Sequence, residues 1–129
     1  MPSIDPQKVC FVVVKAREFD VKVDPVDSAS EGEIEEILED FADDPTYEEI
    51  KGFIDSLNEE EQANLVALVW TGRGDFSGNE WDDALALARE RANDNTSGYL
   101  LGIPLLPDYL EEGLAAFDLS CADFEMGRL

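Results

Sequence analysis

Residues 65–88, LVALVWTGRGDFSGNEWDDALALA, combine an unbroken apolar run, a glycine-rich turn and an amphipathic segment. Asn58 and Glu61 precede the run with the spacing of a capping box, so the pattern predicts a helix that is apolar on most sides. Thr71 and Gly72 are expected to end this helix, because glycine readily adopts the left-handed conformation that follows a last helical turn. Such a helix belongs at the centre of a bundle.

A second helix is expected after the turn, where Gly74 permits another sharp change of direction. Ser77 and Glu80 repeat the capping-box spacing, which predicts that the helix opens at Ser77. Its apolar residues recur with the period of one helical face: Trp81, Ala84, Leu85, Ala88 and Ala92. The two helices should therefore form a hairpin.

The N-terminal segment is predicted to be helical as well. Asp5 followed by Pro6 favours helix initiation, since the carboxylate caps free N–H groups and proline is tolerated at the first helical position. The predicted buried face consists of Val9, Val12, Val13, Ala16 and Phe19. Residues 9–14 are rich in β-branched side chains, so a strand remains the alternative.

The segment that follows is predicted to contain a linker and two helices. Residues 24–32, DPVDSASEG, have the composition of a mobile linker. Residues 33–41 form an acidic helix with a narrow apolar stripe, and Thr46 with Glu49 provides a capping box for the next helix. The buried face predicted for that helix is Tyr47, Ile50, Phe53, Ile54 and Leu57.

The C-terminal part is expected to hold a polar connection over 93–97, a short turn and a final helix, with Gly102 and Pro104 among the residues that divide them. Apolar residues recur along one side: Ile103, Leu106, Leu110, Leu114 and Phe117. Residues 119–129 are expected to fray. The sequence therefore predicts a single all-α domain over 1–129, a compact bundle of five or six short helices around a central apolar helix.

The chain carries a formal net charge of −22, concentrated in residues 25–70. A surface this acidic repels phosphate backbones and anionic lipids, so it disfavours direct nucleic-acid and membrane binding and favours a protein partner with a basic surface. The apolar runs are also shorter than the roughly 18 residues typical of a membrane span. Cys10 and Cys121 are interpreted as free thiols, and the N-terminus lacks the pattern of a secretory signal, so a reducing, cytoplasmic setting is predicted.

Catalytic motifs are scarce in this sequence. The absence of histidine excludes Ser-His and Cys-His nucleophile activation and His-ligated metals. Neither a Walker loop nor a GxGxxG motif is present, and the many carboxylate pairs are best interpreted as a solvated acidic face. We therefore expect a protein that is not an enzyme and that has no organic cofactor.

The central turn has a partial resemblance to a calcium loop. Oxygen-bearing side chains occupy positions 1, 3, 5 and 9 of such a loop: Asp75, Ser77, Asn79 and Asp83. Position 6 is Glu80 instead of glycine, and position 12 is Ala86 instead of glutamate. Calcium or magnesium binding is therefore one hypothesis, and simple helix capping by Asp75 and Ser77 is the other.

Arg73 is a single cation in acidic surroundings within the same turn. Its guanidinium is expected either to pair with Asp82 or Asp83 or to be presented to a partner. Trp81 is interpreted as a core residue, with partner contact as the alternative. The candidate partner-binding residues are Arg73, Asp75, Trp81, Glu35, Glu36 and Glu39.

Several stretches together resemble one protein family: KAREFDVKVDP at 15–25, GRGDF at 72–76, EWDDAL at 80–85 and YLLGIPLLPDYLEEGL at 99–114. The chain resembles a family of small acidic bacterial proteins, found chiefly in alphaproteobacteria and classed as a domain of unknown function. That resemblance implies a cytoplasmic bacterial setting, and it implies no activity, cofactor or catalytic residue.

The function expected from these features is a non-catalytic acidic protein-interaction module. The helix over 33–41 and the Arg73 turn would present its binding surfaces. Self-pairing into a homodimer is also possible through the apolar runs 9–14 and 100–106. The alternatives are a divalent-cation-binding protein that uses the turn from Asp75 to Asp83, and an acidic mimic of nucleic acid.

Overall fold

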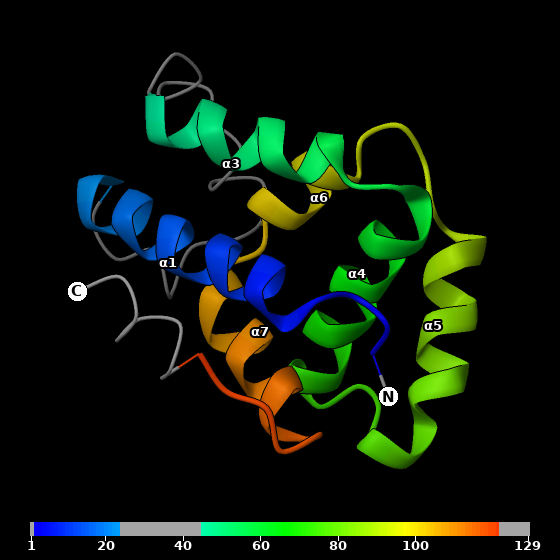
Figure 1. The fold of residues 1–129 in the computed structure, drawn as a ribbon. Helices are drawn as coiled ribbons and strands as arrows, with labels where there is room; N and C mark the ends of the chain where they lie inside the picture. The colour runs from blue at the N-terminus through cyan, green and yellow to red at the C-terminus, as the bar shows by residue number, and fades with distance from the viewer. Residues whose placement is uncertain (1, 24–44, 122–129) are drawn as a thin grey trace.

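A computed structural model describes residues 2–23 and 45–121 of the chain, except for the side chains of 20–23. These residues form six α-helices, one 3₁₀ helix and no strand (Figure 1): α1 (Pro6–Val23), α3 (Pro45–Ser56), α4 (Glu59–Arg73), η1 (Gly78–Glu80), α5 (Trp81–Glu90), α6 (Thr96–Leu101) and α7 (Leu106–Ala115). The prediction of an all-α bundle is confirmed. The predicted linker, the acidic helix over 33–41 and residues 122–129 of the tail lie outside the described residues.

Helix α4 is the central helix, as predicted, and it packs against both α7 and α5. Its start follows from the capping box: the Glu61 N–H donates to Asn58 Oδ1 at 2.7 Å, and the Asn58 N–H donates to Glu61 Oε1 at 3.1 Å. Beyond that cap every residue from 63 to 71 is buried. A helix buried on all sides needs no amphipathic pattern, because its neighbours cover each face.

The end of α4 differs from the prediction. Gly72 lies inside the helix, and the helix ends at Gly74, which has the left-handed φ of 97°. Gly72 instead allows a close approach to α7: a Cβ atom there would lie 1.8 Å from the Tyr109 carbonyl oxygen. On the other side of the contact, a Cβ at Gly113 would lie 2.3 Å from the Leu68 carbonyl oxygen. Two glycines therefore set the spacing of the α4–α7 pair.

Helix α1 confirms the helical interpretation of the N-terminal segment. The Gln7 N–H donates to Asp5 Oδ1 at 2.9 Å, as a cap should. The predicted face is buried, and it packs against α7 and α3. In α3 Ile50 and Ile54 are buried, whereas Tyr47 and Phe53 are half-buried at the edge of the core. This helix begins at Pro45, one residue before the predicted cap at Thr46.

Helix α6 lies where a connection and a turn were predicted, and the final helix α7 follows it as expected. Leu100, Ile103 and Leu106 are all buried. Together with the buried valines of α1, they show that the apolar runs 9–14 and 100–106 are used mainly within the bundle. Self-pairing into a homodimer stays a prediction.

Helix α5 buries Trp81, Ala84, Leu85 and Ala88, the predicted face, while Ala92 is exposed. The prediction for Ala92 was wrong because α5 ends at Glu90, so the helical period no longer applies there. The opening at Ser77 is nearly as predicted, since the Ser77 N–H donates to Glu80 Oε1 at 2.8 Å and η1 precedes α5.

Both ends of the described chain are fastened to the bundle. The Ser3 N–H donates to Oδ1 of the fully buried Asn64 at 2.9 Å, and Asn64 donates back to the Ser3 hydroxyl. Cys10 and Cys121 form a disulfide, so the interpretation of two free thiols was wrong. Residues 111 positions apart in sequence meet only through the tertiary fold. The cytoplasmic setting loses this support and stays a prediction.

Within the described ranges, none of the helices combines the length and the apolar character that a membrane span requires.

Candidate functional site

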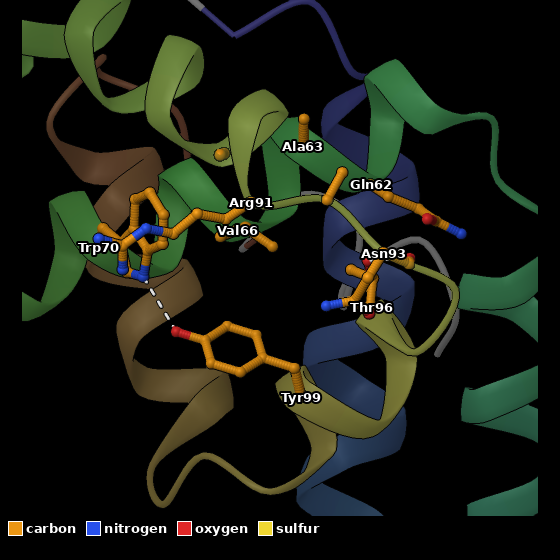
Figure 2. A pocket seen from close by; sticks show the side chains of 10 residues that line it. Gln62, Ala63, Val66, Trp70, Arg91, Asn93, Thr96 and Tyr99 are labelled. Carbon is orange, nitrogen blue, oxygen red and sulfur yellow. Dashed lines mark hydrogen bonds between the residues drawn. The ribbon is translucent and has the colours of Figure 1, made fainter.

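A pocket of about 230 Å³ opens between α4, the C-terminal end of α5 and the start of α6 (Figure 2). Its wall is formed by Gln62, Ala63, Val66, Trp70, Ala88, Arg91, Ala92, Asn93, Thr96 and Tyr99. The buried stretch of α4 supplies the floor, and α6 together with the segment that links α5 to α6 supplies most of the polar groups. The pocket therefore depends on the central hairpin and on α6 together.

The aromatic side of the pocket is held by a hydrogen bond. Trp70 Nε1 donates to the Tyr99 hydroxyl at 3.1 Å, shown as the dashed line in Figure 2. Trp70 is buried, whereas Tyr99 is 42% exposed and is the one exposed large hydrophobic side chain among the described residues. Since the Tyr99 oxygen accepts from Trp70, its own O–H proton is left to donate to a bound molecule.

The polar side of the pocket contains amide, hydroxyl and guanidinium groups and lacks carboxylates. Gln62, Asn93 and Thr96 lie across the pocket from Trp70, and the Arg91 side chain extends towards the Trp70 ring in the view of Figure 2. Asp and Glu make up 31 of the 129 residues of the chain, yet none of those that the structure describes lines the pocket. The lining therefore differs sharply in charge from the rest of the molecule.

Arg91 also differs from the other cations. Six of the seven Lys and Arg side chains that the structure describes form ion pairs: Lys8, Lys15, Arg17, Lys51, Arg73 and Arg89. Arg91 is the seventh, and it has no carboxylate partner in the described part of the chain. An unpaired guanidinium in so acidic a protein keeps its hydrogen-bonding fork available to a ligand.

Carboxylates without a cation are spread over the exterior. Those that are exposed and have no ion pair, among the residues described, are Asp5, Glu48, Glu59, Glu80, Asp82, Asp83, Glu90, Asp94, Glu112 and Asp118. Asp82, Asp83 and Glu90 are exposed residues of α5, which lies at the margin of the bundle (Figure 1). We call these three residues the α5 acidic face.

The ion pair between Arg17 of α1 and Glu111 of α7 has a structural role. Arg17 donates to both carboxylate oxygens of Glu111, at 2.7 and 2.9 Å, and to Asp108 at 3.2 Å. The hydrogen bonds from Arg17 hold the pKa of Glu111 below its ordinary value, and they outweigh the opposing effect of burial. This group of charges fastens two helices and is not directed at a ligand.

Arg73 pairs within its own turn. Its Nε and Nη2 atoms lie 2.8 and 2.7 Å from Asp75 Oδ2, so the expected pairing with Asp82 or Asp83 was wrong. Gly74 folds the chain back so that residues two apart face each other. Burial acts to lower the pKa of Arg73, but the bond to Asp75 raises it above its ordinary value.

Trp81 is a core residue. It is 3% exposed and meets Phe117 edge-on, with ring centroids 5.3 Å apart. Trp81 therefore offers a partner almost no surface in this conformation, and partner contact through it stays a prediction. Of the other candidates, Glu35, Glu36 and Glu39 lie outside the described residues.

The first residue of the candidate calcium loop, Asp75, already has a cationic partner in the structure. Asp75 is turned to Arg73, whereas Ser77 and Asn79 are exposed in the turn before α5 and Asp83 is an exposed residue of α5. Within the described ranges, no three His, Cys, Asp or Glu side chains form a group that could hold a metal ion. Calcium or magnesium binding remains a hypothesis for a measurement.

Sequence reasoning missed the pocket. Its residues come from three helices and from the segment that links α5 to α6, and their side chains meet only after α6 folds against α3 and α5 against α4. Arg91 stands beside Glu90 in the sequence, where it looks like one more member of a charged helix end. One usable signal was Tyr99, an aromatic residue in a segment whose other apolar residues fit a buried face.

Comparisons with known proteins identify a family and no relative of assigned function. The family model "Protein of unknown function (DUF3775)" matches residues 47–119, more than half of the chain. This range begins in α3 and includes every residue that lines the pocket. Neither the curated proteins nor the solved structures include a significant match.

Proposed function

We propose that this chain, which belongs to the DUF3775 family of proteins of unknown function, is a non-catalytic module that binds a protein with a basic surface. The supporting observation is how its charges are distributed. Nearly all described cations are bound to carboxylates of the chain itself, and a large set of exposed carboxylates is left without a cation. The acidic excess therefore faces the solvent.

The α5 acidic face is the part of this surface best suited to docking. Three exposed carboxylates lie within nine residues of one short, rigid helix, which is anchored in the core by Trp81 and Leu85. Carboxylates that are held on a rigid helix lose little conformational entropy when a partner binds. The Arg73 turn is less suitable, because its guanidinium is already held by Asp75.

The acidic field would act mainly on the rate of encounter. Complementary charge raises association rates by steering diffusion, and salt weakens this effect because the Debye length is only about 8 Å at physiological ionic strength. We therefore expect affinity for a basic partner to fall steeply with added sodium chloride.

The test compares two variants that lose the same charge from different places. The first is Asp82→Asn/Asp83→Asn/Glu90→Gln on α5. The control is Glu48→Gln/Glu112→Gln/Asp118→Asn, which removes three other exposed carboxylates that have no ion pair. Binding of a short lysine- and arginine-rich peptide is measured by fluorescence anisotropy at several salt concentrations, and circular dichroism checks that each variant is folded.

The proposal expects the α5 variant to weaken peptide binding by about tenfold, from three surface pairs of about 0.5 kcal/mol each. The control variant should change it by less than about twofold. Equal weakening by both variants would mean that only total charge matters, and the α5 acidic face would be rejected. Binding that neither variant changes would reject the proposal altogether.

A further inference from the structure

We propose that the pocket between α4, α5 and α6 binds a small ring-bearing carboxylate, with Arg91 holding the carboxylate and Trp70 and Tyr99 flanking the ring. The ligand is defined here by its chemistry: one planar apolar ring and one carboxylate. This binding would be separate from the docking of a basic protein on α5, because it uses different residues and the opposite charge.

The charge of the pocket is the first reason to expect a carboxylate ligand. The described lining contains one cation and no acid in a chain with 31 acids and 9 bases. The one cation, Arg91, is also the described cation that has no carboxylate partner. A guanidinium donates two parallel hydrogen bonds to a carboxylate, which matches that ligand better than a neutral group.

The size and shape of the pocket are the reason to expect a ring in the ligand. A cavity of roughly 150 Å³ is enough to hold benzene, so about 230 Å³ leaves room for a ring with a carboxylate attached. Val66 and Ala63 offer an apolar floor, and the rings of Trp70 and Tyr99 offer flat surfaces beside it. Pockets of this composition, mostly apolar with a few polar groups, are typical of small-molecule sites.

Arg91 has one other role that the structure allows. It follows the last residue of α5, where a cation is favoured by the partial negative charge of the helix end. That role needs only the charge near the helix axis and makes no use of the pocket. A ligand titration separates the two roles, because a helix-end effect does not depend on which molecule is added.

The experiment uses the two tryptophans of the chain as probe and internal control. Only Trp70 lines the pocket, and its indole N–H is the group bonded to Tyr99. Trp81 is buried against Phe117, away from the pocket. The ¹⁵N-labelled protein is titrated with benzoate, with benzamide and with acetate at constant ionic strength, while the two indole signals are followed by NMR.

The expected result is a saturable shift of the Trp70 signal with benzoate and an unchanged Trp81 signal. Benzamide, which has the ring without the charge, and acetate, which has the charge without the ring, should each bind at least about tenfold more weakly. Arg91→Gln should weaken benzoate binding by a similar factor. Arg89→Gln makes the same charge change two residues earlier, outside the pocket, and should leave binding within about twofold.

Four results would overturn the inference. Benzoate could leave Trp70 unshifted, or benzamide could bind as well as benzoate, which would mean that the carboxylate is not recognised. Arg91→Gln could bind benzoate as well as the unchanged protein does. Finally, Arg89→Gln could weaken binding as much as Arg91→Gln, which would assign the effect to net charge. The salt-dependent peptide binding described above is independent of all four results.

Discussion

Replacing Gly72 by alanine should strongly destabilise the fold, because α4 and α7 touch through their backbones at that point. The added Cβ would lie 1.8 Å from the Tyr109 carbonyl oxygen and 2.8 Å from the Gly113 nitrogen, whereas ordinary contact begins near 3.4 Å. Both obstructing atoms belong to a helix backbone, so no side-chain rotation can relieve the clash. The helices must separate, and the packing between them is lost with the separation.

The magnitude follows from two opposing effects. Overpacking a well-packed core costs up to about 3 kcal/mol, and the upper end applies here because the obstruction is backbone. Alanine regains about 1 kcal/mol over glycine within a helix. The free energy of unfolding should therefore fall by about 2 kcal/mol, which corresponds to a melting temperature about 8 °C lower for a domain of this size.

The matched control is Gly52→Ala in α3. Gly52 is an exposed helical glycine, and a Cβ there would meet nothing within 4 Å. This variant should gain about 0.5–1 kcal/mol from helix propensity alone. Urea denaturation followed by circular dichroism gives the free energy of unfolding of both variants. A Gly72→Ala protein as stable as the Gly52→Ala protein would refute the close approach of α4 and α7.

Three further outcomes are expected. Because Arg17 holds the pKa of Glu111 low, the stabilisation from this ion pair is present above the unfolded pKa near 4.3 and is lost as pH falls through the folded pKa. Glu111→Gln should therefore cost about 0.5 kcal/mol at pH 7. Urea titrations should show that this difference begins to shrink as the pH falls through the unfolded pKa and vanishes below the folded pKa. Reduction of the disulfide should lower the melting temperature, since a link across 111 positions removes about 5 kcal/mol of chain entropy from the unfolded state. Cys10→Ser should melt at the same temperature with and without reductant. Millimolar calcium or magnesium should raise the melting temperature no more than sodium chloride of equal ionic strength, and a calcium-specific rise that Asp75→Ala abolishes would contradict this.

Local signals in the sequence were sufficient for most of the fold. The capping signals, Asn58 with Glu61 and Asp5 with Pro6, involve residues only a few positions apart. Capping hydrogen bonds form at both places in the structure. The apolar faces of α1 and α5 follow from the helical period alone. Such features can be predicted because the groups that interact are already neighbours in the chain.

Contacts between residues far apart in the sequence could not be predicted from such local signals. Gly72 was interpreted through its conformational freedom, whereas its role depends on how close Tyr109 comes. The pairing of Cys10 with Cys121 likewise requires α1 and the end of the chain to meet. Both cases need the packing of α7, which the sequence does not place.

The pocket is the extreme case of this limit. Arg91 is distinguished by what it lacks, a carboxylate partner, and that property is defined only when every neighbour is known. From the sequence, the candidate cation was Arg73, which the structure pairs with Asp75. Charge patterns thus predicted the acidic exterior and missed the pocket that Arg91 lines.

The disulfide between Cys10 and Cys121 also determines how the protein carries mechanical load. When the two ends of the chain are pulled apart, tension runs from the N-terminal segment through the sulfur–sulfur bond to the C-terminal segment. The residues between the two cysteines, including α3 to α6 and the pocket, bear none of it. Pulling on the two ends can therefore extend the segment between the cysteines only after the bond is reduced.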